Sequence, residues 1–166
     1  MIPLGSTDMT LSRMGLGTWA IGGGPAWNGD LDLQICIDTI VEAHRCGINL
    51  IDTAPGYNFG NSEVIVGQAL KQLPRREVVV ETKCGIVWER TGSLFNKVGD
   101  RQLYKNLTPE SIREEVEASL QRLGIDTIDI YMTHWQSVEP CFTPIAETVA
   151  TLNALKKRSE ERRVGK

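Results

Sequence analysis

Hydrophobic runs that end on polar residues mark the strand-like segments of this chain. "INLID" ends at Asp52, "VVVETK" ends at Lys83 and "IDIYMTH" ends at His134. The second of these runs is rich in β-branched residues and does not alternate with polar ones, as expected for a strand covered on both faces. The opening residues predict a hairpin followed by a first strand near 14–17, and the fourth strand is expected over 127–133.

Apolar residues at helical spacing separate these strands. One helix is predicted from about Leu31 to Gly47, and a second over 61–73 with a cap at Asn61 or Ser62 and a stop at Pro74. Thr108 and Pro109 mark the start of a third helix that ends at Gly124, and a fourth begins near Ile145. We expect the intervening residues 84–107 to form a long polar loop, either a flap over a pocket or a disordered segment.

The order strand then helix, repeated four times, predicts parallel strands joined by right-handed crossovers. A doubly wound sheet would show a G-x-G-x-x-G turn after its first strand, which "GLGTWAIGGG" lacks. The pattern therefore favours a (β/α)₈ TIM barrel of the α/β class, although such a barrel has about 250 residues. The expected fold is that barrel truncated to about its first four βα units, with an N-terminal hairpin.

The composition is that of a soluble globular domain, with 166 residues of which 41% are hydrophobic. No apolar run is long enough to span a membrane, and the start of the chain does not resemble a signal peptide. We therefore expect a cytoplasmic protein without a membrane partner. The net charge of −3 argues against nucleic acid as a partner. The four cysteines form no C-x-x-C pair, which favours free thiols.

Four residues near the ends of the predicted strands suggest proton transfer to a carbonyl group. These are Asp52, Tyr57, Lys83 and His134. An ammonium beside a tyrosine favours its phenolate and so eases release of its proton, and a partly buried lysine needs a counter-charge such as Asp52. His134 could orient a substrate carbonyl by a hydrogen bond. Taken singly, each of these residues could be structural, but placement at the ends of successive parallel strands favours a shared site.

Other candidates are weighed against plain packing. Trp19, Trp27, Trp88 and Trp135 follow strands and could line a pocket for an apolar substrate, with core packing an equal alternative for Trp27 and Trp88. His44 lies on a helical apolar stripe and is expected to be structural. No metal site is expected, because two histidines are too few for a metal-dependent barrel hydrolase.

The segments "GLGTW", "NLIDTAPGYNFGNSE", "VVVETK" and "REEVEASLQRLGIDTIDIYMTHW" together resemble the N-terminal half of the aldo-keto reductase family over about residues 2–155. The resemblance implies a carbonyl reductase that uses NADPH or NADH, with Tyr57 as proton donor. Asp52 and Lys83 would tune Tyr57, and His134 would orient the substrate. The backbone of Gly17, Thr18 and Trp19, with the side chain of Asp52, would lie near the nicotinamide.

Among subfamilies, the chain looks most like bacterial enzymes that reduce small aldehydes such as methylglyoxal. One departure is the longer loop "YNFGNSE", where the family often has Tyr-Gly-x-Ser-Glu, and it is expected to reshape the substrate mouth. Most cofactor-binding residues of the family lie in the other half of the barrel, so residues 1–157 are expected to be that N-terminal half and inactive alone. Two alternatives are a non-catalytic binding protein, like the potassium-channel subunits with this fold, and a self-associating half-barrel.

The last residues form a separate, basic segment. Six Lys or Arg and two Glu fall between Lys156 and the end, and "RSEERRVGK" over 158–166 resembles a translated sequencing adapter. We expect 158–166 to be a foreign tail. The physiological substrate, the choice between NADPH and NADH, and the oligomeric state do not follow from the sequence.

Overall fold

The computed structural model of the chain describes residues 1–27, 29, 31–88 and 90–164. The chain forms two compact units. Unit 1 comprises Met1–Lys83 and Ser119–Met132, and unit 2 comprises Cys84–Ala118 and Thr133–Lys166.

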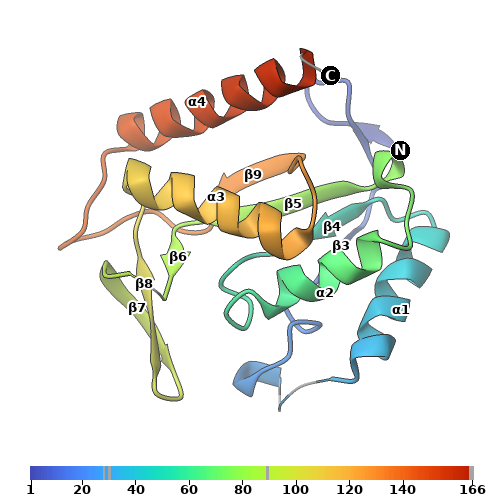
Figure 1. The fold of residues 1–166 in the computed structure, drawn as a ribbon, viewed down its shortest axis with the longest axis horizontal. Coiled ribbons are helices and arrows are strands. Elements are labelled where there is room, and N and C mark those ends of the chain that lie inside the picture. The colour runs from blue at the N-terminus through green and yellow to red at the C-terminus, as the bar shows by residue number, and fades with distance from the viewer. Residues whose placement is uncertain (28, 30, 89, 165–166) are drawn as a thin grey trace. The chain divides into compact units, whose positions relative to one another are not determined.

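Unit 1 is built around a four-stranded sheet (Figure 1). Its strands are β3 (Gly15–Gly17), β4 (Leu50–Asp52), β5 (Val79–Cys84) and β9 (Ile130–Thr133), in the spatial order β3-β4-β5-β9. The pairs β3–β4 and β4–β5 are parallel. The amide of Asp129 donates to the Val80 carbonyl and that of His134 to the Cys84 carbonyl, so β9 also runs parallel to β5. The predicted hairpin is present as β1 (Ile2–Pro3) and β2 (Thr10–Leu11).

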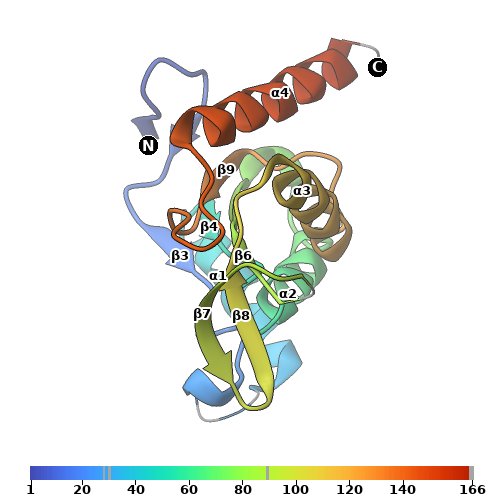
Figure 2. The same ribbon diagram turned by 90° about the vertical axis from the view of Figure 1, so that its left-hand side faces the viewer.

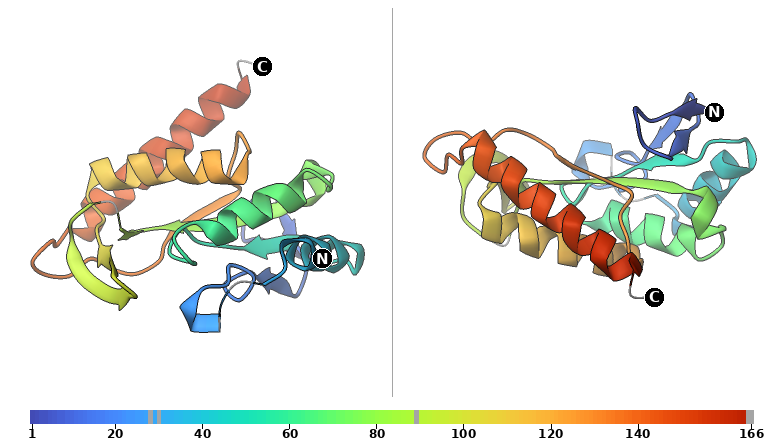
Figure 3. Two further views of the ribbon diagram at one scale, coloured as in Figure 1. Left: turned by 60° about the horizontal axis from the view of Figure 1, so that its bottom comes forward. Right: turned by 90° about the horizontal axis from the view of Figure 1, so that it is seen from above.

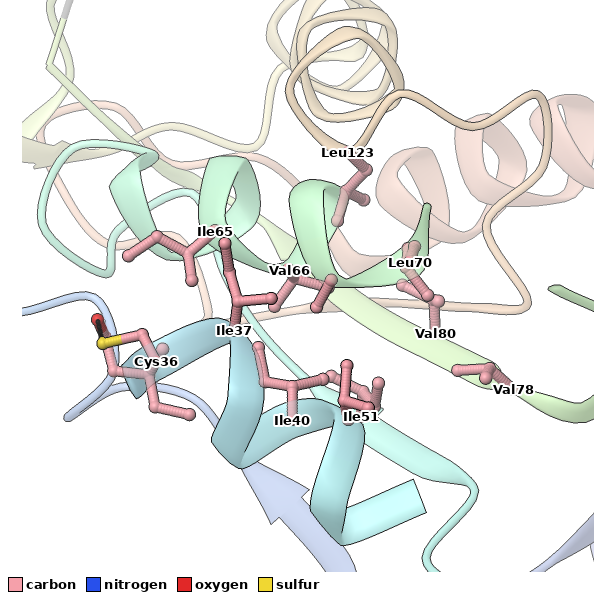
Figure 4. Close-up of a cluster of buried hydrophobic side chains, with 13 residues drawn as sticks. Cys36, Ile37, Ile40, Ile51, Ile65, Val66, Leu70, Val78, Val80 and Leu123 are labelled. Atoms are coloured by element: carbon pink, nitrogen blue, oxygen red, sulfur yellow. Dashed lines mark hydrogen bonds between the residues drawn. The ribbon is translucent and has the colours of Figure 1, made fainter. Parts of the chain in front are cut away.

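Two helices of unit 1 bury their apolar faces against this sheet. They are α1 (Leu33–Arg45) and α2 (Asn61–Leu70), and α2 runs alongside β4 and β5 (Figure 3). Asp32 caps α1 by accepting a hydrogen bond from the Ile35 amide at 3.0 Å. Figure 4 shows the core that results. It contains Ile37 and Ile40 from α1, Val66 and Leu70 from α2, Ile51 from β4, Val80 from β5 and Leu123.

The prediction of a long polar loop over 84–107 is wrong. Unit 2 has here a three-stranded antiparallel sheet of β6 (Ile86–Val87), β7 (Ser93–Val98) and β8 (Arg101–Lys105), in the order β6-β8-β7. Figure 2 shows β7 and β8 as a long twisted hairpin. The two-residue turn Gly99–Asp100, with Gly99 at φ 60°, joins them. A Gly-Asp pair between two runs is a hairpin signal, because the glycine readily adopts positive φ.

The last two helices begin where the sequence predicts. α3 (Pro109–Leu123) has its N-terminal part in unit 2 and its last residues in unit 1, and α4 (Ile145–Val164) lies in unit 2. α4 continues through Arg158, which donates to Glu117 at 2.5 Å. The foreign origin of 158–166 stays a prediction, and residues 165–166 lie outside the described chain.

Three predicted boundaries are shifted, each for a local reason. α2 has Gly60 as its N-cap at φ 86° instead of an Asn61 or Ser62 side chain. It ends at Leu70 because the next amides bond three residues back, which tightens the last turn before the short 3₁₀ helix η2 (Arg75–Glu77). β9 starts at Ile130 because the residues before it bond to a side chain. Arg75 donates to the Thr127 carbonyl and to the Asp129 carboxylate.

The observed units β3–α1, β4–α2, β5–α3 and β9–α4 agree with the predicted α/β class. The short 3₁₀ helix η1 (Pro25–Trp27) lies in the loop between β3 and α1. Among the described residues, no helix combines the length and the apolar character needed to cross a membrane.

Candidate active site

Asp52, Tyr57 and Lys83 meet in unit 1 around a single ammonium group. Lys83 Nζ lies 3.2 Å from the Tyr57 hydroxyl and forms an ion pair with the Asp52 carboxylate. It also donates to the Thr53 carbonyl at 3.0 Å. Lys83 is only 8% exposed, so this charge is held largely away from water and its carboxylate partner matters. Three of the four predicted catalytic residues are therefore in direct contact through Lys83.

Strand register explains how two of these side chains meet. Asp52 lies opposite Glu81 in the parallel pairing of β4 with β5, and Lys83 follows Glu81 by two residues. Side chains two residues apart on a strand point to the same face, so Asp52, Glu81 and Lys83 share one face of the sheet. The long lysine side chain reaches back across to Asp52.

Tyr57 comes from a tight turn directly after β4. Its amide donates to the Ala54 carbonyl at 3.1 Å, and the Gly60 amide donates to the Pro55 carbonyl at 2.7 Å. Asn58 and Phe59 adopt φ of 50° and 54°. Asparagine tolerates this left-handed conformation, whereas for a bulky residue such as Phe59 it is strained. The longer loop noted in the sequence is thus a compact, bonded turn.

Three buried hydroxyl groups, those of Thr18, Thr53 and Ser62, connect the strands to α2. The Ser62 hydroxyl at the start of α2 lies 2.7 Å from that of Thr18 and 2.9 Å from that of Thr53. The Thr18 hydroxyl also donates to the Asp52 carbonyl at 2.9 Å. β3, β4 and α2 are therefore tied together at the level of Asp52.

A buried carboxylate supports β5 from the same side. Glu63 is fully buried, and its oxygens accept from the Thr82 hydroxyl and from Arg122 Nε, each at 2.6 Å. Thr82 directly precedes Lys83 and faces the opposite side of the strand. This ion pair fixes the segment of β5 that presents the lysine.

Glu81 adds a second carboxylate to the face that carries Asp52. Burial raises the pKa of Glu81 above its ordinary value, and the charge of Asp52 raises it further, while Lys83 opposes the shift. The Glu81 side chain makes this face more negative when it ionises.

The residues expected near the nicotinamide end of the cofactor differ from one another in their surroundings. A Cβ on Gly17 would lie 4.0 Å from Asp52 Oδ2, and Gly17 is exposed. Trp19 is 52% exposed and stacks on Tyr57 with ring centroids 6.2 Å apart. The Thr18 side chain is buried in the hydroxyl network, so its side chain serves the fold.

The remaining predicted site residues belong to unit 2. His134 follows β9, and its amide donates to the Cys84 carbonyl at 2.8 Å. Trp135 is exposed, with its ring 5.8 Å from that of Phe95 and Lys105 Nζ 4.9 Å from its centroid. Trp88 is half-buried. Participation of His134, Trp88 and Trp135 in one site with Tyr57 stays a prediction.

The sequence predicted no place in the site for several residues that hold it together. They are Thr53, Ser62, Glu63, Glu81 and Arg122. One signal was visible for Glu63, an acidic residue at the start of the mostly apolar helical run "EVIVGQAL". Because a buried carboxylate needs a counter-charge, burial of Glu63 would require a basic residue from another part of the chain. For His44, the structure agrees with a structural role, since Nε2 lies 3.8 Å from Glu77.

Proteins similar to this chain share its fold and sequence. The chain is 87% identical over 164 residues to an NADH-specific methylglyoxal reductase of Escherichia coli, covering 99% of this chain and 50% of that protein. It is 41% identical to the aldo-keto reductase YhdN of Bacillus subtilis, covering 98% of this chain and 45% of the relative. The chain therefore spans about half the length of the curated relatives it matches.

A solved structure agrees with these sequence matches. The glycerol dehydrogenase AKR11B4 of Gluconobacter oxydans superimposes with a TM-score of 0.76 at 40% identity, over 95% of this chain and 45% of that one. The family model for the aldo/keto reductases matches residues 13–165. With Asp52, Tyr57 and Lys83 in contact at the ends of parallel strands, the sequence matches and the fold lead to one conclusion: the chain belongs to the aldo/keto reductase family.

Proposed function

We propose that this chain is the N-terminal, catalytic half of an NAD(P)H-dependent reductase of small aldehydes such as methylglyoxal. The observation that carries the proposal is the contact of Lys83 Nζ with the Tyr57 hydroxyl, 3.2 Å apart, and with the Asp52 carboxylate. The name of the E. coli relative supports the substrate class and the use of a nicotinamide. In this proposal the complete protein is a (β/α)₈ barrel with the site at the C-terminal ends of its strands.

Tyr57 acts as the general acid. Its hydroxyl proton passes to the carbonyl oxygen as the carbonyl carbon gains hydride, so the C=O π pair ends on oxygen and the product is an alcohol. Lys83 stabilises the phenolate that remains until solvent returns a proton. Asp52 balances the lysine charge and keeps the ammonium directed at the Tyr57 oxygen.

The residues present suit the nicotinamide end of the cofactor. Gly17 is exposed beside the Asp52 carboxylate, and Trp19 offers an exposed flat ring next to Tyr57. We assign Gly17, Trp19 and Asp52, with the backbone of Thr18, to hold that end. When bound, the nicotinamide supplies the hydride. His134 is proposed to donate a hydrogen bond to the substrate carbonyl, and Trp88 and Trp135 to line the pocket.

The experiment uses a full-length version, made by joining residues 1–157 of this chain to the C-terminal half of the E. coli methylglyoxal reductase. We expect it to oxidise NADH with methylglyoxal, and Tyr57→Phe to lose about 100-fold or more in kcat, the typical contribution of a general acid. The matched control is Tyr104→Phe in β8, which removes an equivalent hydroxyl from unit 2 and should leave turnover unchanged.

The outcomes separate the alternatives. Retention of activity by Tyr57→Phe would refute the assigned chemistry. Binding of NADH without turnover by the unmutated full-length version would support a non-catalytic binding protein instead. For residues 1–166 alone we propose negligible turnover, and clear NADH oxidation by the purified chain would contradict this.

A further inference from the structure

Three aromatic rings form a row that starts at the proposed proton donor. Trp19 stacks on Tyr57 at 6.2 Å with an interplanar angle of 30°, and Trp27 meets Trp19 edge to face at 5.1 Å and 82°. Trp19 and Trp27 keep 52% and 41% of their surface exposed. Large exposed aromatic faces in contact with a reactive group are typical of binding sites. Trp27 has no role in the proposed chemistry.

The loop that bears Trp27 is clamped by the loop that bears Tyr57. Asn58 Nδ2 donates to the Gly22 carbonyl at 2.8 Å, and Asn61 Nδ2 donates to the same oxygen at 2.9 Å. The Asn58 carboxamide also lies directly against Gly24, where a Cβ would come within 2.7 Å of its oxygen. Both tryptophans are therefore attached to a backbone segment that Asn58 and Asn61 hold together, and Asn58 alone also contacts it at Gly24.

The clamp depends on an uncommon backbone conformation. Asn58 and Phe59 lie at positive φ, and this bend turns the Asn58 side chain toward Gly22. Trp27 is held in turn, since its amide donates to the Gly24 carbonyl at 3.0 Å. Strained backbone conformations persist only where the surrounding structure fixes them, and they cluster at active sites and ligand-binding loops.

We propose that Trp27 and Asn58 are specificity-determining residues: Trp27, beyond Trp19, contacts the non-reacting part of carbonyl substrates that carry a planar, ring-sized substituent, and Asn58 holds that ring in place. The proposal rests on the proposed function, because it takes Tyr57 as the point where the carbonyl binds. A methyl-sized substituent at Tyr57 reaches at most Trp19. A ring reaches Trp27 as well, and gains the edge and face contacts that aromatic pairs favour.

The first test compares benzaldehyde with methylglyoxal in the full-length version. Trp27→Ala should lower kcat/KM for benzaldehyde by roughly 3- to 10-fold, the value of one aromatic contact, and leave methylglyoxal unchanged. Trp27→Phe should restore most of the loss. An unchanged ratio of the two substrates in Trp27→Ala would overturn the proposal and leave the row as plain packing.

Asn58→Gly tests the clamp without adding strain, because glycine adopts the same positive φ freely. It should raise KM for benzaldehyde and leave kcat for methylglyoxal unchanged, which a general loss of folding would not do. Asn58→Asp, which removes the donor and keeps the shape, should behave like Asn58→Gly. Normal benzaldehyde kinetics in both variants would refute the role of Asn58.

A readout independent of turnover keeps the two proposals distinguishable. In an NMR titration with benzaldehyde, the indole N–H signals of Trp19 and Trp27 should shift, with Trp27→Phe identifying the second signal. Acetaldehyde should leave the Trp27 signal in place. If the full-length version reduces neither aldehyde, the proposed function fails, yet the indole shifts still decide whether the row binds aromatic carbonyls. Absence of a benzaldehyde-induced shift at Trp27 would refute the inference.

Discussion

Glu63 and Arg122 are bound to each other at 2.6 Å across 59 residues of sequence, with the carboxylate fully buried. Removal of the arginine alone leaves a negative charge without its counter-ion in the interior. We predict that Arg122→Met lowers the free energy of unfolding of the full-length version by about 3 kcal/mol, measured by urea denaturation.

The control for this pair is the double variant Glu63→Gln, Arg122→Met. It removes both charges, so it should be clearly more stable than Arg122→Met. Glutamine retains an oxygen that can accept from the Thr82 hydroxyl, which preserves the contact beside Lys83. Equal stabilities of the single and double variants would show that the unpaired Glu63 carboxylate carries no penalty, contrary to this prediction.

Gly67 lies where α2 passes close to the end of α3. A Cβ there would come within 2.6 Å of the Leu123 carbonyl oxygen and 2.7 Å of the Arg122 carbonyl oxygen. Gly→Ala inside a helix ordinarily stabilises, but here the extra methyl group forces two backbones apart. We predict that Gly67→Ala destabilises by about 1–3 kcal/mol. Gln68→Ala, one residue further on the same helix, is the matched control and should be near neutral in thermal unfolding.

Glu81 makes stability depend on pH in a specific direction. Burial and the charge of Asp52 raise its pKa in the folded protein, so the folded state binds this proton more tightly than the unfolded chain does. The ionised carboxylate therefore disfavours folding, and stability falls as pH rises from the ordinary glutamate pKa through the raised one. Glu81→Gln should remove this decline. The measurement is the difference in urea midpoint between the two proteins across that pH range, and a constant difference would contradict the assignment.

The sheet of unit 1 ends at β3 on one side and β9 on the other, and within the described residues neither edge pairs with a further strand. Exposed strand edges promote pairing between chains. We therefore predict that residues 1–166 self-associate, seen as a concentration-dependent mass in light scattering after gel filtration. The full-length version should show no such dependence. A monomeric chain with a sharp unfolding transition would refute this.

Much of unit 1 could be predicted because its signals are local. The apolar run before Lys83 and the helical spacing of Ile37 and Ile40 each specify an element and its buried face. The β7–β8 hairpin was missed because its polar residues suggested a loop, although the Gly99–Asp100 turn between two short runs was a usable signal.

The contact of Lys83 with Tyr57 and Asp52 could be predicted, whereas the residues that support it could not. Tyr57 and Lys83 stand out because they follow strands, whereas nothing in the sequence couples Glu63 to Arg122 or Ser62 to Thr18. Such pairs arise from tertiary packing between distant segments. A single sequence carries no record of that packing.

In unit 1, different residues hold the proton-donor strands and the aromatic row in place. Ser62 holds the strands at Asp52, while Asn58 holds the loop of the two tryptophans through the Gly22 carbonyl. On the roles proposed above, substitutions of Trp27 and Asn58 would alter which aldehyde is accepted without disturbing the proton donor. A mutagenesis library confined to Trp27 and Asn58 should yield variants with changed substrate range far more often than inactive ones, which makes this loop the natural starting point for redesign.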